Sequence, residues 1–339
     1  MFPKTRSLLN EIITEKAAPG ITYQIITKKQ HETKLIGAKQ LVPSKQPLTA
    51  DQKNYYDIAS LTKVIATTIR ICQLIESKKL TTESLVQSFL PEFRYPDITV
   101  LDLLTHSSGL AKSIPGFKIE NRTDLRRYVF STEQVRARHE FVEYSDVNFL
   151  LLGYLIETLD GAFEKSIKKH ILGPLCMNDT TFYQAMNKDQ SIPTEIDPNR
   201  GLIQGVVHDF KAFIAKENTG HAGLFSTMTD LSLFAQALLL NDGTPILSKE
   251  MTKRLAQNYT PSLNRSRGLG FDLKKTNHGY ALYHTGFTGT FITLDLETKN
   301  GLIVLSNRVH PTRKNNLFNE KRDIIAETFL KETESYSKK

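Results

Sequence analysis

The stretch YYDIASLTKVIATT, residues 55–68, places two polar side chains at the start of an otherwise apolar run. Ser60 and Lys63 are three residues apart, so one turn of helix would bring the lysine amine within reach of the serine hydroxyl. A hydroxyl beside an amine can act as a nucleophile with its base, and the Ser60 backbone N–H could receive a developing oxyanion. A helix N-terminus would also lower the pKa of Lys63. The alternative interpretation makes Ser60 a plain helix N-cap.

Two further motifs follow along the chain. Tyr144-Ser145-Asp146 stands immediately before an apolar helical stretch, and His284-Thr285-Gly286 ends an expected strand just before a glycine-bearing turn. The three motifs in the order S-x-x-K, Y-x-[N/D] and [K/H]-T-G are far more specific together than S-x-x-K is alone. Their combination favours a catalytic serine over a helix cap.

With these motifs the sequence resembles the family of serine β-lactamases and penicillin-binding-protein-like hydrolases. The resemblance is greatest to the class C β-lactamase branch, with its esterases and D-alanyl-D-alanine carboxypeptidases, and it covers nearly the whole chain. The segments that carry it, in family order, are YDIASLTK (56–63), LLTHSSGL (103–110), YSDVNFLLLGYLIE (144–157), ILGPLCMNDTTF (171–182), GVVHDFKAF (205–213), GHAGLFSTMTDLSLFAQALL (220–239) and HTGFTGT (284–290).

The resemblance implies an acyl-enzyme mechanism that needs no cofactor or metal. Ser60 would attack a carbonyl carbon, and the backbone amides of Ser60 and Phe287 would hold the oxyanion. Lys63 and Tyr144 would share the proton transfers, while Thr285 and Gly286 would line the substrate site. Water would then release the acyl group.

Two departures from the family pattern bear on substrate choice. His284 stands where the family commonly has lysine, and Asp146 stands where it commonly has asparagine. Histidine with its ordinary pKa is mostly neutral at pH 7, and an ionised Asp146 would repel a substrate carboxylate. We therefore expect an esterase-like or amidase-like hydrolase with weak or no activity on β-lactams. If Asp146 pairs with Lys63, it should keep that amine charged and leave Tyr144 as the better general base; the alternative role of Asp146 is to cap the following helix.

Other functions stay open at this point. A D-alanyl-D-alanine carboxypeptidase or a hydrolase of cell-wall fragments is the main enzymatic alternative, and a non-catalytic binding protein on the same fold is the alternative of another class. The histidines lack metal-site spacing. His221 is expected to be a hydrogen-bonded loop residue near the cleft, His106 a structural turn residue, and Arg308 a residue that meets substrate or lies solvated in its loop. Cys72 and Cys176 are expected to be buried and unpaired.

The elements that must position these residues predict an α+β fold. The expected order of elements indicates a three-layer α/β/α arrangement around an antiparallel sheet. The elements are a helix before Pro19-Gly20, strands at 21–28 and 33–39, a helix over 60–77, strands after 275 and a last helix at 315–332. The middle of the chain has helical stretches at 82–89, 100–105, 146–159 and 161–171. We expect an α/β domain of residues 1–79 and 206–339, a helical insertion of residues 80–205, and the active site in the cleft between them. Loops 112–140 and 184–204 would shape the pocket.

Composition narrows the partners. Among 339 residues, lysine and arginine exceed aspartate and glutamate by 44 − 36 = 8. The basic residues are scattered without aromatic interleaving or a nucleic-acid-binding motif, so no nucleic-acid partner is expected. No apolar run is long enough for a membrane span, and no secretory signal is visible, which predicts a cytoplasmic protein unless a leader has been removed. The expected partner is a small ester or peptide substrate that could derive from peptidoglycan; the oligomeric state stays open.

Overall fold

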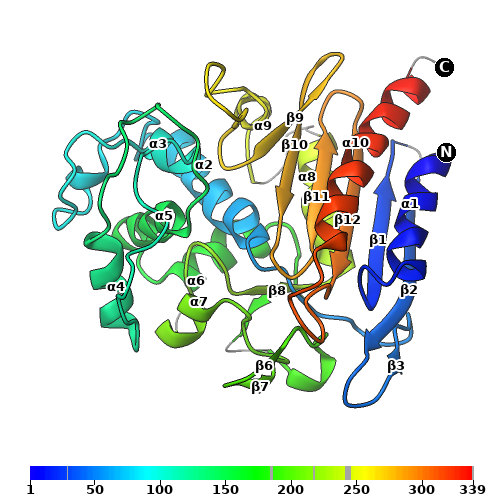
Figure 1. The fold of residues 1–339 in the computed structure, drawn as a ribbon. Coiled ribbons are helices and arrows are strands. Elements are labelled where there is room, and N and C mark those ends of the chain that lie inside the picture. The colour runs from blue at the N-terminus through cyan, green and yellow to red at the C-terminus, as the bar shows by residue number, and fades with distance from the viewer. Residues whose placement is uncertain (29, 184–185, 217, 241–245, 338–339) are drawn as a thin grey trace.

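A seven-stranded antiparallel sheet forms the centre of the molecule (Figure 1). The computed structural model describes residues 1–28, 30–183, 186–216, 218–240 and 246–337. In sheet order the strands are β3 (Gln46–Pro47), β2 (His31–Gln40), β1 (Gly20–Ile26), β12 (Asn300–Ser306), β11 (Phe291–Asp295), β10 (Gly279–Thr285) and β9 (Asp272–Thr276). Strand β1 pairs with β12 from Ile21 opposite Ser306 to Ile26 opposite Gly301. The two ends of the chain therefore share one sheet, as the sequence predicted.

The helices and the remaining short strands surround this sheet. In chain order the helices are α1 (Pro3–Thr14), η1 (Lys63–Thr68), α2 (Ile69–Glu76), η2 (Val86–Ser88), α3 (Val100–Leu104), α4 (Arg122–Phe130), α5 (Asp146–Asp160), α6 (Phe163–Ile167), η3 (Lys168–Leu172), η5 (Lys188–Gln190), α7 (Phe210–Ala215), α8 (Met228–Leu240), α9 (Lys249–Leu255) and α10 (Leu317–Ser337). The short strands are β4 (Tyr56–Asp57), β5 (Thr181–Phe182), β6 (Ile196–Asp197), β7 (Gly201–Leu202) and β8 (Leu224–Ser226).

Each face of the sheet has its own hydrophobic core, because successive side chains of a strand point to opposite faces. On β12, Leu302 and Val304 pack with α1 and α10, while Ile303 and Leu305 belong to the larger core on the other face. Helix α8 covers that second face behind the sheet in Figure 1, together with the helical run that follows Ser60. The expected three-layer architecture is confirmed, with α8 as a covering helix that the sequence reading did not include.

Helices α3 to α6 lie to one side of the sheet (Figure 1), but turns and loops make up most of the described residues between 80 and 205. Helix α5 closely matches the expected helix at 146–159. Two details differ: residues 82–89 contain only the short turn η2, and α4 forms within the stretch that was expected to be a loop, where Asn121 caps it by accepting from the Asp124 N–H. The division of the chain into domains at residues 79–80 and 205–206 stays a prediction.

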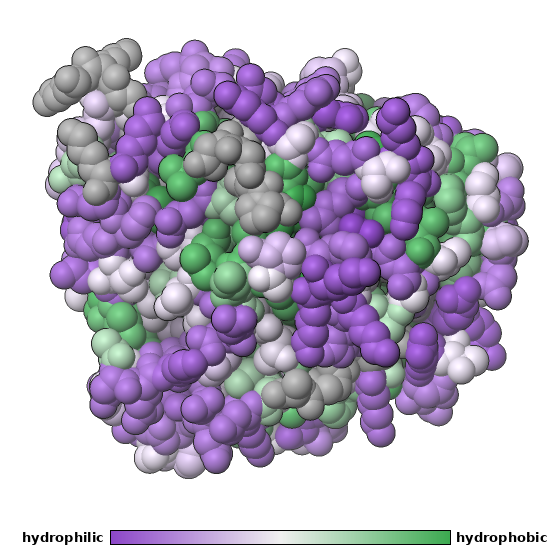
Figure 2. Space-filling model, turned by 180° about the vertical axis from the view of Figure 1, so that it is seen from behind, coloured by the Kyte–Doolittle hydropathy of each residue, from purple (hydrophilic) through white to green (hydrophobic). Residues whose placement is uncertain are grey.

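The surface is largely hydrophilic on the side opposite to the view of Figure 1, with hydrophobic residues in separate patches (Figure 2). None of the helices in the described part of the chain is both long and apolar enough to cross a bilayer. Cys72 is buried, but Cys176 is exposed, which corrects the expectation for the second cysteine. Cys176 occupies a left-handed turn position (φ 55°) after η3, and the neighbouring Met177 is buried instead.

Candidate active site

Ser60 lies in a tight turn between β4 and the helical run that begins at Leu61. Ala59 adopts a left-handed backbone conformation (φ 47°), which is uncommon for a residue with a side chain. Its N–H donates to Asp57 Oδ1 (2.8 Å), and Asp57 Oδ2 accepts from the His208 N–H (2.7 Å). One buried carboxylate therefore holds the turn in a conformation that presents Ser60, half-buried, to the pocket.

The helix predicted over 60–77 is present, with a wider turn at its start. Residues 63–68 form the π-helical turn η1, which continues into α2. Turns of this kind are rare and often occur at functional sites. Thr67 Oγ1 donates to the Gly220 carbonyl (2.6 Å), so a side chain of η1 is bonded to the segment that carries His221.

Lys63 is completely buried, and all three donors of its ammonium group are used. Nζ donates to Ser60 Oγ, to Asp146 Oδ1 and to the His221 carbonyl, each at 2.9 Å. The contacts expected from Lys63 to Ser60 and to Asp146 are therefore both present. Because the lysine cannot turn toward solvent, its charge state is set by these neighbours.

Asp146 bridges two lysines, because its Oδ2 accepts from Lys211 Nζ (3.2 Å) while its Oδ1 accepts from Lys63. Burial opposes its ionisation, but the positive charges of Lys63, His221 and Lys211 hold the pKa of Asp146 well below its usual range. Burial alone would lower the pKa of Lys63, yet the negative charge of Asp146 and a contribution from Tyr144 raise it. The expected lowering by the helix N-terminus is wrong, because the carboxylate at 2.9 Å outweighs the helix dipole.

The alternative role of Asp146 as a helix cap is also wrong. Ser145 is the N-cap of α5, and its hydroxyl accepts from the Val147 N–H (3.2 Å). Asp146 is the first residue of the helix, so its carboxylate is free to face Lys63. A negative charge in a first helical turn is favourable in itself.

Tyr144 lies over Lys63 at the mouth of the pocket, with 36% of its surface exposed. Lys63 Nζ is 5.2 Å from the centre of its ring. The ring also packs against His106 (4.6 Å between ring centres) and lies 6.1 Å from His284. His106 has a left-handed backbone (φ 57°), and its Nδ1 faces the Ser145 N–H at 3.2 Å, so it is the structural turn residue that was expected and also a support for Tyr144.

The third motif ends β10 and turns back toward the segment that precedes Ser60. The Gly286 N–H donates to the Thr290 carbonyl (2.7 Å), Thr288 Oγ1 donates to the Asp57 carbonyl (2.8 Å), and Thr290 Oγ1 donates to the Ile58 carbonyl (3.2 Å). A Cβ atom on Gly286 would lie 2.1 Å from Thr290 Oγ1 and 2.6 Å from the Ile58 carbonyl oxygen, so only glycine fits there. These bonds hold the turn 286–290 in a fixed relation to the serine.

The two backbone amides expected to form an oxyanion hole, those of Ser60 and Phe287, belong to residues that line the same pocket. Within the described residues, neither N–H donates a hydrogen bond to another protein group. Free N–H groups held on a fixed backbone are what stabilisation of an oxyanion requires.

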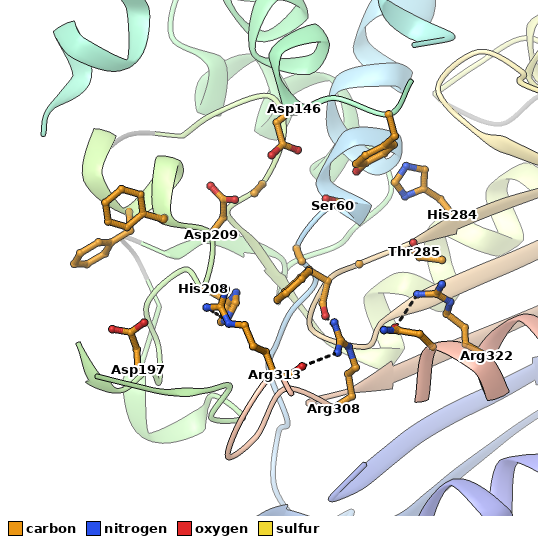
Figure 3. A pocket seen from close by; sticks show the side chains of 18 of the residues that line it. Ser60, Asp146, Asp197, His208, Asp209, His284, Thr285, Arg308, Arg313 and Arg322 are labelled. Carbon is orange, nitrogen blue, oxygen red and sulfur yellow. Dashed lines mark hydrogen bonds between the residues drawn. The ribbon is translucent and has the colours of Figure 1, made fainter. Parts of the chain in front are cut away.

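His284 is 3% exposed and lies beside Tyr144 on the pocket wall (Figure 3). Burial, with the positive charges of Arg267 and Lys63, lowers its pKa to about 3. The imidazole is therefore neutral at physiological pH, as the sequence reading expected, although burial causes this more than the ordinary pKa of histidine does. Position 284 offers no positive charge to a substrate.

The pocket around Ser60 has a volume of about 950 Å³, and positive charge lies on one flank of it (Figure 3). In this view Arg308 lies below Ser60, Arg322 below and to its right, and Arg313 below and to its left beside His208, while Asp209 lies to the left of Ser60 and Asp146 above it to the left. Arg308, for which contact with substrate and a solvated loop position were both open, lines the pocket and is buried, not solvated. Two loops were expected to shape the pocket. Residues 112–140 do not line it. Residues 184–204, of which 184 and 185 lie outside the described part, line it through Asp197, Asn199 and Arg200.

Arg308 is a buried cation (5% exposed) whose hydrogen bonds go to backbone carbonyls in the described part of the chain. They reach the carbonyls of Phe287 (3.1 Å), Arg313 (3.5 Å) and Asn315 (3.3 Å). Burial and the charges of Arg322 and Arg313 lower the pKa of Arg308. Arg313 is held by Glu195, with 2.7 Å between its Nε and Glu195 Oε2. Arg313 is paired with Glu195 and Arg322 with Asp323, whereas Arg308 has no carboxylate partner among the described residues, so its positive charge can attract an anionic group.

His221 forms a second buried contact with a carboxylate in the same network. Its Nε2 lies 2.8 Å from Asp209 Oδ1, and Asp209 caps α7 by accepting from the Ala212 N–H. Burial opposes the ionisation of Asp209, but His221 lowers its pKa to about 2. Possible metal-ligand atoms of Asp146, Asp209 and His221 lie within 4.8 Å of one another. Lys63 and Lys211 both bond to Asp146, so its negative charge is already compensated by two protein cations.

Four residues of the site were not predicted from the sequence: Lys211, Asp209, Arg313 and Arg322. Lys211 and Asp209 lie inside the segment GVVHDFKAF, which was recognised only as a similarity to the family. An aspartate followed closely by a lysine at the start of a short helix is the sequence feature that could have pointed to them. Nothing local distinguishes Arg322 from other charged residues of the last helix. It lines the pocket only because α10 crosses the sheet beside β11 and β12.

Comparisons with known proteins show the family and the fold of the chain. The family model Beta-lactamase matches residues 6–326. A protein from Salmonella gallinarum named "Putative D-alanyl-D-alanine carboxypeptidase" is 27% identical over 312 residues, which cover 78% of this chain and 72% of that protein. The octameric penicillin-binding protein homologue from Pyrococcus abyssi superposes with a TM-score of 0.73 and 25% identity, covering 90% of this chain and 73% of that one. A class C beta lactamase superposes with a TM-score of 0.77 and 19% identity, covering 98% of both chains.

Proposed function

Because the chain belongs to the beta-lactamase family, we propose that it is a serine hydrolase that forms an acyl-enzyme on Ser60. The observation that carries this proposal is the 2.9 Å contact between Lys63 Nζ and Ser60 Oγ beside the free amides of Ser60 and Phe287. Ser60 Oγ would attack the carbonyl carbon of an ester or amide while its proton passes to the base. The developing negative charge on the carbonyl oxygen would be held by the two N–H groups.

Tyr144 is the general base that the charges favour. Lys63 is held in its charged form by Asp146, so it has no lone pair to accept a proton, which leaves Tyr144, whose ring centre is 5.2 Å from Lys63 Nζ, as the base. The proton that Tyr144 takes from Ser60 would go to the leaving alcohol or amine as the carbonyl C–O or C–N bond breaks. In the second step Tyr144 would take a proton from water as the water oxygen attacks the acyl carbon. The bond from that carbon to Ser60 Oγ then breaks, Tyr144 returns the proton to Ser60 Oγ, and the free acid leaves.

The substrate proposed here carries a carboxylate. His284 is neutral, but Arg308 and Arg322 place positive charge on the flank of the same pocket. The expected repulsion by Asp146 is offset, because Lys63 and Lys211 both bond to that carboxylate. A flexible, acyclic substrate can reach the arginine flank, whereas a fused β-lactam holds its carboxylate at a fixed distance from the carbonyl. We therefore keep the expectation that β-lactams are turned over poorly.

A D-alanyl-D-alanine carboxypeptidase is the second candidate. The arginine flank favours it, because such a peptide ends in a free carboxylate one residue beyond the scissile amide. The Salmonella relatives named for this activity also support it. Water-soluble cell-wall fragments ending in D-alanine are the corresponding substrate class.

The test is intact-protein mass spectrometry of the wild type and Ser60→Ala after exposure to a fluorophosphonate, a p-nitrophenyl ester, a peptide ending in two D-alanine residues and a penicillin. We expect a phosphonate adduct that requires Ser60, with turnover of the ester or peptide. A stable penicilloyl adduct with peptide turnover would favour the carboxypeptidase. An absence of any adduct in a folded protein would refute the hydrolase and leave a non-catalytic binding protein.

A further inference from the structure

Beside Asp209, on the side away from Arg308 and Arg322, the pocket is also lined by the apolar side chains of α7. Three of the four exposed aromatic residues in the described part of the chain line this one pocket: Tyr144, Phe210 (56% exposed) and Phe287 (47% exposed). Phe287 lies against the arginines, with the Arg308 and Arg313 guanidinium groups 4.9 and 5.5 Å from its ring centre, so Phe210 is the one of these three that α7 supplies. Phe141 is the fourth and lies outside it. Exposed aromatic side chains gathered in a concave site mark a place where apolar ligand surface is buried.

Helix α7 supplies most of this apolar flank, through Phe210, Phe213 and Ile214. The helix is fixed to the catalytic network at its start, because Asp209 caps it and bonds to His221 and because Lys211 bonds to Asp146. The Phe210 ring is therefore on a support whose position is set by the groups that hold Lys63.

Phe213 is held in place from the other side. The guanidinium group of Arg200 lies 3.9 Å from the centre of the Phe213 ring, and it donates to the His208 and Val207 carbonyls. The charged groups of this flank thus bond to one another or to the backbone. What remains for a ligand is mainly aromatic and aliphatic surface.

We propose that α7 forms a subsite for an apolar acyl group, so that the substrate is amphiphilic: an uncharged aromatic or medium-length aliphatic acyl group lies against Phe210, and an anionic leaving portion lies toward the arginines. This inference rests on the proposed function, since the two flanks become acyl and leaving sides only if Ser60 attacks between them. Phe210 is the specificity-determining residue, and Phe213 and Arg200 position the surface beside it.

The experiment compares kcat/KM for p-nitrophenyl acetate, butyrate, hexanoate and phenylacetate, which share one leaving group, in the wild type, Phe210→Ala and Phe141→Ala. Phe141 is a matched control, because it is an exposed phenylalanine with the Arg136 guanidinium 5.2 Å from its ring centre, outside the pocket. We expect the wild type to prefer hexanoate and phenylacetate over acetate. Phe210→Ala should reduce that preference roughly tenfold, whereas Phe141→Ala should leave it unchanged.

A second measurement does not depend on turnover. Calorimetric binding of the hexanoate and acetate esters to Ser60→Ala should favour hexanoate, and Ser60→Ala/Phe210→Ala should lose that difference. An acyl preference that Phe210→Ala leaves intact in both measurements, or no acyl preference in the wild type, overturns the subsite. Failure of Ser60 to react with the fluorophosphonate would instead count against the proposed function, so the two failures are distinguishable.

Discussion

Removing the charge of Asp146 should destabilise the protein at neutral pH, because Lys63 would become a buried cation without a carboxylate. The two groups are 2.9 Å apart, and at an effective dielectric constant of ~20 their attraction is about 6 kcal/mol. In Asp146→Asn the amide oxygen can still accept a hydrogen bond, so the net loss should be smaller. Breaking a buried pair in this way costs about 3 kcal/mol, which corresponds to a Tm lower by about 6 °C at ~2 °C per kcal/mol.

The stability lost in Asp146→Asn should become smaller as pH rises. In the wild type the raised pKa of Lys63 contributes stability that is fully present below the unfolded-state pKa of ~10.4 and is lost only as pH rises through the higher folded-state pKa. In Asp146→Asn, burial should instead lower the pKa of Lys63. The variant then carries its penalty at neutral pH and sheds it as the amine deprotonates, so the difference from the wild type should shrink between pH 7 and pH 10.

The assay is thermal unfolding followed by circular dichroism, for the wild type, Asp146→Asn and Glu92→Gln at pH 7, 8.5 and 10. Glu92 is the control, because its pair with Arg126 is exposed on both sides and should contribute less than about 1 kcal/mol. Equal Tm values for Asp146→Asn and the wild type at pH 7 would refute the reasoning. So would a deficit that stays constant across the pH range.

Three further predictions concern the chemistry. Tyr144→Phe should slow acylation at least about 100-fold in single-turnover measurements, and near-normal acylation would instead make Lys63 the base. Gly286→Ala should lower kcat about 100-fold, because the added methyl group displaces the Phe287 amide. Thr290→Ser keeps the hydroxyl that bonds to the Ile58 carbonyl and should have nearly normal kcat. Equal activity of the two variants would contradict the oxyanion role of the Phe287 amide. Because the pKa of His284 is about 3, His284→Asn should change the rate without moving the apparent pKa values of kcat/KM between pH 5 and 8, and a shifted inflection would show that His284 titrates there.

The sequence by itself determined the local parts of the site. Ser60 and Lys63 meet because a helical turn brings residues three apart to one side, and Ser145 caps α5 because a serine precedes an apolar helical run. The strands were predicted from β-branched runs bounded by turn residues near the start of the chain and from alternation after residue 275, and both signals are local. These inferences hold because their physical causes act within a few residues.

Only the tertiary structure decided the charge state of Lys63 and the character of the two flanks. Asp146 is 83 residues from Lys63 along the chain and Lys211 is 65 from Asp146, so no local pattern fixes that they bond. Likewise, Arg322 meets the pocket through the packing of α10, and Phe210 through the placement of α7. Electrostatic energies depend on distance and burial, and both are set by packing between segments that are remote in sequence.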